Sequence, residues 1–169
     1  MTTTIIVAAG LAVLLALAGG LLTEVGPWYR ALRKPGWNPP DWAFGPIWTV
    51  ILSLLAASGV LAWRGAHTPT AHLQVAIYFA VNWVFHLAWS PLFFKLKRPD
   101  WALIENMFLL GSVAALVIGL RPFSVLASWL DVPYLVWVTI ALYLNYTIVR
   151  LNEPFSGVGN TAATSQGAA

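Results

Sequence analysis

Five long stretches of the chain are almost free of formal charge, and this feature constrains the fold more than any other. They are residues 5–22, 44–63, 73–94, 102–120 and 132–149, each 18 to 22 residues long. A helix rising about 1.5 Å per residue needs roughly 17–25 residues to cross the hydrocarbon core of a bilayer. Backbone groups in lipid must be hydrogen-bonded within their own segment, so each stretch predicts a helix. The sequence therefore predicts an all-α membrane protein with a five-transmembrane-helix bundle.

Composition excludes several other classes of protein. Hydrophobic residues make up 59% of the 169 residues and charged residues only 9%, whereas soluble domains have about 45–50% and about 25%. Soluble enzymes and nucleic-acid-binding modules are therefore largely excluded, and no nucleic-acid partner is expected. The absence of cysteine excludes disulfides and thiolate metal sites. No nucleophile–base pair, metal-ligand cluster or phosphate loop is recognisable, so we predict no catalytic residue, no metal site and no required cofactor.

The basic residues predict the orientation in the membrane. With five spans, the first loop, the third loop and the C-terminus lie on one face of the membrane. That face carries seven basic residues: Arg30, Arg33, Lys34, Lys95, Lys97, Arg98 and Arg150. The opposite face carries only Arg64 and Arg121. The positive-inside rule then predicts an external N-terminus and a cytoplasmic C-terminus, in a membrane such as the bacterial cell membrane.

Two further segments complete the predicted organisation. Residues 1–155 are expected to form the helical domain, and residues 156–169, which are small and polar, a disordered tail. The first loop, residues 23–43, contains four prolines and three tryptophans. Proline fixes φ and removes a donor, so this loop is expected to be stiff and largely non-helical. It is interpreted as a lid over the bundle, the alternative being an interfacial belt of tryptophans.

The third predicted helix carries polar residues on one face. Asn82, His86 and Trp89 are spaced i, i+4 and i+7. Polar side chains in a bilayer usually face the bundle interior or a cavity. The favoured interpretation of His86 is a hydrogen bond between helices. Contact with a polar ligand and axial ligation of a haem iron are the alternatives.

Glu105 is the only acidic residue within a predicted span, one helical turn after Trp101. An ionisable residue inside the membrane is a functional candidate. Equally, Glu105 lies close enough to the basic third loop to snorkel or to pair with a base there. Both interpretations are open from the sequence.

The first and last predicted helices carry weaker patterns. Ala12, Ala16 and Gly20 form a small-residue face that allows close packing within the bundle or between protomers. The last helix places a set of residues along one face, namely Trp137, Ala141, Leu144 and Asn145. Its end, with Leu144, Tyr146 and Arg150, fits a proposed cholesterol-recognition pattern that often occurs by chance.

Several strings resemble the signature of the TspO/MBR family, the translocator and tryptophan-rich sensory proteins. The most specific are Lys34-Pro35-Gly36-Trp37-Asn38-Pro39-Pro40 and the late Leu144-Asn145-Tyr146. Between them come Phe44-Gly45-Pro46-Ile47-Trp48-Thr49, Ala88-Trp89-Ser90-Pro91-Leu92-Phe93-Phe94, Trp101-Ala102-Leu103 and Pro133-Tyr134-Leu135-Val136-Trp137. The resemblance covers roughly residues 28–152, and its spacing agrees with all five spans.

The resemblance implies a five-helix bundle, commonly a homodimer, with a pocket beneath the first loop. The family binds tetrapyrroles such as protoporphyrin IX and haem, and its animal members bind cholesterol. Matched by position, the implied aromatic walls are Trp37, Trp48, Trp89, Trp101 and Trp137, with Ala141 and Leu144 on the last helix. Leu144, Tyr146 and Arg150 match the sterol motif. The chain departs from the family in carrying His86 where relatives usually have asparagine, and Glu105 where some have aspartate.

The expected function is therefore that of a membrane protein that binds a porphyrin or another apolar small molecule and acts as a transporter or sensor. One alternative is light- or oxygen-dependent degradation of the bound porphyrin. Another is a ligand-responsive regulatory partner of a second membrane protein.

Overall fold

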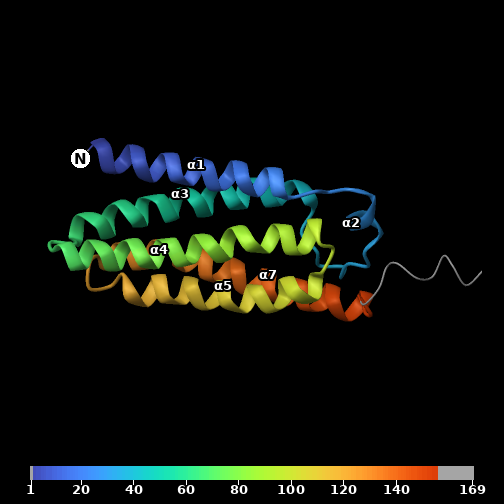
Figure 1. Ribbon diagram of the computed structural model, residues 1–169. Coiled ribbons are helices and arrows are strands. Elements are labelled where there is room, and N and C mark those ends of the chain that lie inside the picture. The colour runs from blue at the N-terminus through green and yellow to red at the C-terminus, as the bar shows by residue number, and fades with distance from the viewer. Residues whose placement is uncertain (1, 156–169) are drawn as a thin grey trace, which may run out of the picture.

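The computed structural model describes residues 2–155, and within that range every regular element is a helix. Five helices are long and apolar enough to cross a membrane, which confirms the predicted architecture. They are α1 (Thr2–Leu22), α3 (Asp41–Gly65), α4 (Pro69–Ser90), α5 (Pro99–Gly119) and α7 (Val132–Asn152). The start of α1 and the end of α7 lie at opposite ends of the bundle (Figure 1). The tail predicted for residues 156–169 lies outside the described residues.

The helices form a tightly packed group with one helix at its edge. Helix α5 packs against α4 and α7, and α1 packs mainly against α3. The core contains Leu55, Val113, Leu116 and Val138, all nearly inaccessible. Of the residues of α1, only Leu15 is buried. Lipid tails are as apolar as these side chains, so the hydrophobic effect does not force α1 into the bundle.

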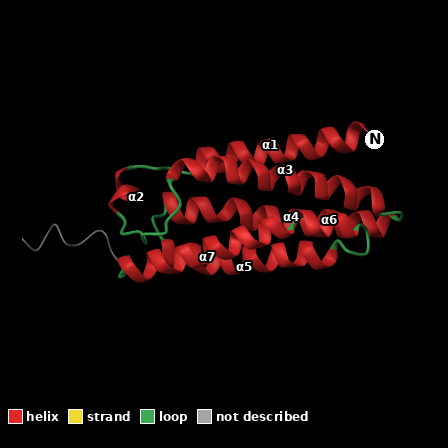
Figure 2. Ribbon diagram, turned by 180° about the vertical axis from the view of Figure 1, so that it is seen from behind, coloured by secondary structure: helices red, strands yellow, loops and turns green. Residues whose placement is uncertain are grey.

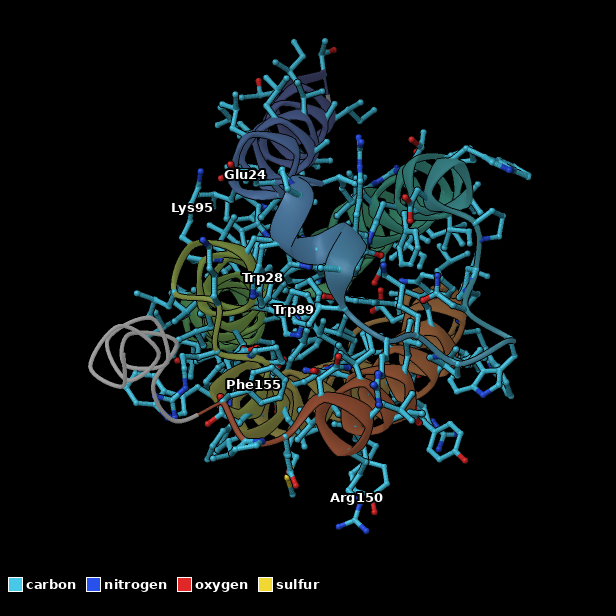
Figure 3. All side chains as sticks on the ribbon, turned by 90° about the vertical axis from the view of Figure 1, so that its right-hand side faces the viewer. Glu24, Trp28, Trp89, Lys95, Arg150 and Phe155 are labelled. Carbon is cyan, nitrogen blue, oxygen red and sulfur yellow. The ribbon has the colours of Figure 1, made fainter. Side chains whose placement is uncertain are left out.

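Three short elements lie at the bundle ends: α2 (Pro27–Ala31), η1 (Pro91–Lys95) and α6 (Val125–Leu130). The first loop is largely non-helical, as expected, apart from α2. Proline suits the first turn of a helix because its missing N–H has no intrahelical partner there, and Pro27 begins α2. Seen from this end, α2 crosses over the bundle (Figure 3). Helix α6 lies at the other end (Figure 2).

The segment η1 continues α4 as one turn of π-helix. Pro91 has no N–H to donate, so the α-helical ladder is interrupted there. The N–H of Leu96 instead donates to the carbonyl of Pro91 at 2.9 Å, a five-residue spacing. The wider turn of the π-helix rotates the side chains that follow it about the helix axis. Consequently two consecutive residues, Phe93 and Phe94, are both buried.

Asp131 corrects the expectation that Glu105 is the only acid within a span. Helices α6 and α7 form one apolar segment, Val125–Asn152, and Asp131 lies inside it. Its side chain is fully buried, and the hydroxyl of Ser58 donates to its Oδ2 at 2.7 Å. Asp131 therefore joins α7 to α3 inside the bundle and does not mark the membrane surface.

Candidate ligand-binding site

Aromatic rings from α3, α4 and α7 meet inside the bundle around Trp48. The centroid of its ring lies 4.9 Å from that of His86, 5.9 Å from that of Tyr134 and 6.4 Å from that of Trp137. All three are edge contacts, the geometry that the ring quadrupole favours. Phe44 adds an edge contact with Trp137 at 5.8 Å. We call these five residues the aromatic cluster, and it unites three of the predicted site residues: Trp48, His86 and Trp137.

A second group of rings connects the interior to α2. Trp89 stacks on Phe93 at 4.9 Å, and Trp28 of α2 makes an edge contact with Phe93 at 5.9 Å. Tyr29 packs on Phe94 at 5.5 Å. Trp28 and Trp89 lie close together beneath α2 in Figure 3. We call these residues the α2-side group. It places the predicted residue Trp89 directly under the first loop.

Hydrogen bonds from the polar face of α4 join this helix to α5 and α7. The ring Nδ1 of His86 and the hydroxyl of Tyr134 on α7 are 2.9 Å apart. The amide of Asn82 donates to the hydroxyl of Ser112 on α5 at 3.0 Å. These bonds support the favoured interpretation of His86, a hydrogen bond between helices. They also leave only the second ring nitrogen of His86 for any ligand.

Several buried side-chain atoms have no hydrogen-bond partner among the described residues, namely the amide oxygens of Asn38, Asn82 and Asn106, one oxygen of Asp131, and the atoms of two further groups. One is the carboxylate of Glu105, whose side chain is buried although neither of its oxygens is bonded. The other is the indole N–H of Trp137. Nearly all buried polar groups in proteins are paired, so these two groups are candidates for contact with a bound molecule or water. Within the described residues, Glu105 neither snorkels nor pairs with a base.

A small set of polar contacts lies at the α2 end of the bundle. The hydroxyl of Tyr29 donates to Asp41 at 3.3 Å, and the Lys34 ammonium donates to the carbonyl of Tyr29 at 2.8 Å. The same ammonium lies 4.0 Å from the centroid of the Tyr29 ring. Burial, followed by the charge and hydrogen bond of Asp41, raises the pKa of Tyr29 to about 12. The phenol is thus neutral at physiological pH and helps hold α2 against α3.

Two predicted aromatic walls lie outside this interior. Trp37 is 45% exposed and stacks on Tyr143, an exposed residue of α7, with centroids 5.3 Å apart. Trp101 is 49% exposed, and the Arg98 guanidinium covers its ring at 4.4 Å. Both residues belong to the surface at the α2 end. Of the aromatic residues that the resemblance implies as pocket walls, Trp48, Trp89 and Trp137 lie in the interior, whereas Trp37 and Trp101 lie at the surface.

The predicted face of α7 divides in a similar way. Leu144 is buried with the α2-side group and Ala141 is half-buried, whereas Tyr146 and Arg150 are exposed. Arg150 points away from the bundle in Figure 3. The sterol-like motif thus has residues on both sides of its helix. Asn145 is buried against the start of α5, where its amide can donate to the carbonyl of Pro99 at 3.2 Å and accept from the N–H of Leu103 at 3.1 Å.

Sequence reasoning missed several aromatic residues of the interior. Tyr134 lies one helical turn before Trp137, and this i, i+3 spacing would have placed it on the same face. Phe44 precedes Trp48 by four residues and was detectable in the same way. Phe93 and Phe94 were not detectable, because both are buried only through the π-turn.

The comparisons with known proteins agree with this architecture. The model of the TspO/MBR family matches residues 6–151. The human translocator protein is 35% identical over 135 residues, covering 77% of this chain and 78% of its own. The tryptophan-rich protein TspO of Chlorobaculum tepidum is 36% identical over 146 residues, covering 85% and 92%. The tryptophan-rich sensory protein of Cereibacter sphaeroides is 37% identical over 135 residues, covering 79% and 82%. The chain belongs to the TspO/MBR family and is an integral, multi-pass membrane protein.

Proposed function

We propose that the protein binds a tetrapyrrole, such as protoporphyrin IX or haem, or another flat apolar molecule, between its helices beneath α2. The observation that carries this proposal is the pair of unpartnered groups, Glu105 and the Trp137 indole N–H, in an interior rich in aromatic rings. The proposed role is that of a transporter or sensor, in line with the relatives named translocator and tryptophan-rich sensory protein.

The chemistry of the lining residues suits such a ligand. Stacking on an aromatic face adds roughly 0.5–1.5 kcal/mol per ring pair beyond the burial of apolar area. Trp48, Trp89 and Trp137 offer these faces. The Trp137 indole can donate to an acceptor on the ligand, and Glu105 can accept from a pyrrole N–H. The carboxylate side chains of a porphyrin would favour the basic α2 end, near Arg33 and Lys34.

We also propose a homodimer and a fixed orientation in the membrane. Ala16 and Gly20 are exposed on α1, where small residues allow a second helix to approach closely. The elements that carry the seven basic residues of the predicted cytoplasmic face gather at the α2 end of the bundle (Figure 1). Under the positive-inside rule, the α2 end and the C-terminus face the cytoplasm and the N-terminus faces outward.

The first experiment is a titration of the purified protein with protoporphyrin IX in the dark, followed by tryptophan fluorescence. Trp137→Phe keeps a ring but loses the indole N–H. One hydrogen bond contributes about 0.5–1.5 kcal/mol, so the dissociation constant should rise about 2- to 10-fold. The matched control is Trp129→Phe, an exposed tryptophan of α6 at the other end of the bundle. Equal affinities for both variants and the wild type would refute the proposed site.

Illumination of the same samples separates binding from degradation. Trp48 and Trp137 are oxidisable rings in mutual edge contact, and this contact favours photochemistry as the second candidate function. Loss of porphyrin absorbance with new products, abolished by Trp48→Phe, would establish degradation. Quenching without any product would limit the activity to binding.

A further inference from the structure

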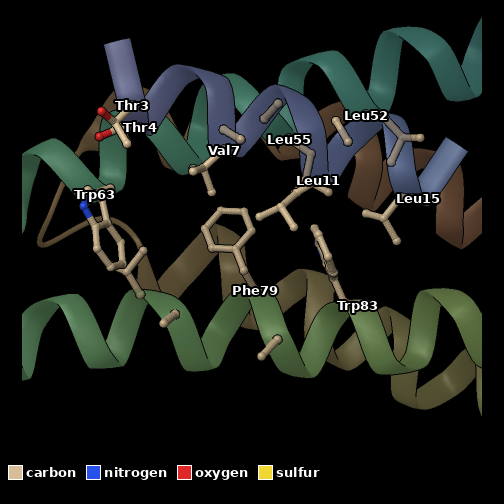
Figure 4. Close-up of a pocket in the computed structure, with 17 residues that line it drawn as sticks. Thr3, Thr4, Val7, Leu11, Leu15, Leu52, Leu55, Trp63, Phe79 and Trp83 are labelled. Atoms are coloured by element: carbon tan, nitrogen blue, oxygen red, sulfur yellow. The ribbon is translucent and has the colours of Figure 1, made fainter. Parts of the chain in front are cut away.

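A second hollow lies outside the candidate site, between α1, α3 and α4. It has a volume of about 480 Å³, within the range of roughly 300–1,000 Å³ typical of ligand pockets. We call it the α1 groove. Figure 4 shows Leu11 of α1 facing Phe79 and Trp83 of α4 across it. None of its lining residues belongs to the aromatic cluster or to the α2-side group.

The groove exists because three helices present small residues to the same space. On each helix two of them are three or four positions apart and thus share a face. They are Ala8 and Ala12 on α1, Ala56 and Gly59 on α3, and Ala76 and Ala80 on α4. Small residues usually allow close helix packing in membranes, and α1 does pack closely against α3, but α1 and α4 make far less contact with each other. The space left by these side chains stays open between α1 and α4.

The two ends of the groove differ in polarity. The hydroxyls of Thr3 and Thr4 and the indole of Trp63 lie together at one end (Figure 4). This is the end of the bundle away from α2, where α1 begins and α3 ends. Tryptophan at such a position is typical of the lipid–water interface. Leu15 and Trp83 close the other end, deep in the bundle. The groove is therefore polar at the membrane surface and apolar towards its middle.

The shape of the groove suits one hydrocarbon chain. From Thr3 to Leu15 along α1 the groove extends about 18 Å. Its volume of about 480 Å³ is enclosed by residues of three helices along that length. A slot that is long and narrow accepts an extended acyl chain more readily than a rigid fused-ring molecule.

The charge at the polar end favours an anionic headgroup. Among residues 2–155, the exposed formal charges at this end of the bundle are those of Arg64 and Arg121. Arg64 follows Trp63 directly, and the backbone at Gly65 touches that of Phe123, which brings the loop containing Arg121 beside the end of α3. Asp131, the acid at this end, is fully buried.

We propose that the α1 groove is a binding site for an anionic phospholipid. One acyl chain lies along Leu11, Phe79 and Trp83, and the headgroup sits at Thr3, Thr4 and Trp63, at the end of the bundle whose loops carry the two arginines. The bound chain fills the space between α1 and α4. It thereby supplies packing to the helix that contributes only Leu15 to the buried core.

The test uses a phosphatidylglycerol that carries a photoreactive group in the middle of one chain. The detergent-purified full-length protein is titrated with this probe and irradiated, and the labelled peptides are mapped by mass spectrometry. We expect saturable labelling of α1 and α4 around Leu11 and Trp83. A phosphatidylcholine probe with the same chain should label several-fold less at equal concentration.

Variants of α3 provide a matched pair. Ala56→Leu fills the groove, whereas Ala57→Leu adds the same volume at an exposed position outside it. Labelling should fall at least five-fold for Ala56→Leu and stay unchanged for Ala57→Leu. Ala80→Leu fills the groove from the opposite wall and should repeat the effect if Ala56→Leu fails to fold, as judged by its circular dichroism.

Three outcomes would overturn the proposal. Labelling that never saturates and is equal in all variants would mean ordinary contact with bulk lipid. Equal labelling by the two headgroups would remove the anionic specificity. Crosslinks between two chains through Leu11 or Trp83 would show that a second copy occupies the groove.

Discussion

At the scale of single residues, Gly65 marks a close approach between two segments of the chain. A methyl group placed on Gly65 would lie 1.8 Å from the carbonyl oxygen of Phe123. Backbone atoms at such a site have little room to move, so Gly65→Ala should reduce the free energy of unfolding by about 1–3 kcal/mol. Unfolding in detergent, followed by circular dichroism, measures this change.

The control for this prediction is Gly111→Ala on α5. Apart from its chain neighbours and the backbone of its own helix, no atom lies within 4 Å of a methyl group at that position. Alanine favours a helix over glycine by up to about 1 kcal/mol, so this variant should be neutral or slightly more stable. If Gly65→Ala is as stable as Gly111→Ala, the close approach of α3 to the loop before α6 is wrong.

The raised pKa of Tyr29 predicts that the stability of the folded protein depends on pH. Its pKa is raised to about 12 by burial and by Asp41, above the usual value of 10.0. As the pH rises, Tyr29 therefore loses its proton in the unfolded chain before it does so in the folded protein. The stabilisation by the neutral phenol declines as the pH rises from 10 through 12. Tyr29→Phe has no proton to lose, so the stability advantage of the wild type over Tyr29→Phe should shrink over that range. The exposed Tyr146→Phe should follow the wild type, and a constant difference between wild type and Tyr29→Phe would contradict the prediction.

At the scale of elements, the first loop is hydrogen-bonded to the end of α7. The N–H of Arg33 donates to the side-chain oxygen of Asn152 at 2.8 Å, and the amide of Asn152 donates back to the carbonyl of Arg33 at 2.8 Å. Asn152→Ala removes both bonds, and each is worth about 0.5–1.5 kcal/mol. Hydrogen exchange at Arg33 and its neighbours should therefore accelerate about 5- to 100-fold.

The exposed neighbour Glu153 supplies the control for the loop. Glu153→Ala should leave exchange in the first loop unchanged, and both variants should retain the exchange rates of α5. Faster porphyrin association and dissociation in Asn152→Ala would further identify the loop as the gate of the proposed site. Unchanged exchange at Arg33 would show that the contacts of Trp37 and Tyr29 hold the loop without Asn152.

At the scale of the whole molecule, the charge asymmetry predicts the orientation of the bundle. The chain has no cysteine, so single cysteines can be introduced without background. His67→Cys lies in the loop between α3 and α4, and Gly36→Cys lies in the first loop. A membrane-impermeant maleimide applied to intact cells should label His67→Cys, and it should label Gly36→Cys only after permeabilisation. The reverse pattern would invert the topology.

The architecture was predictable from the sequence because the bilayer restricts where charged residues can occur along the chain. Charges are expensive in lipid, so the spacing of charged residues outlines the spans. Asp131 is an exception to this rule, because a hydrogen bond from Ser58, a residue 73 positions away, stabilises its buried side chain. Helical periodicity placed His86 and Trp137 on faces directed at the interior, and the family resemblance added Trp48. The resemblance did not distinguish these residues from Trp37 and Trp101, because an aromatic side chain suits a pocket and a membrane interface equally well.

The sequence by itself thus determined that this chain crosses the membrane five times, which helix faces are polar, and to which family it belongs. Only the tertiary structure decided which rings meet. The burial of Phe93 and Phe94 depends on the π-turn at Pro91, and the isolation of Glu105 depends on what α4 and α7, the helices packed against α5, place around it. The α1 groove depends on small residues of three helices facing one another. Periodicity describes one helix at a time, whereas a site is formed by several helices whose relative positions follow from packing.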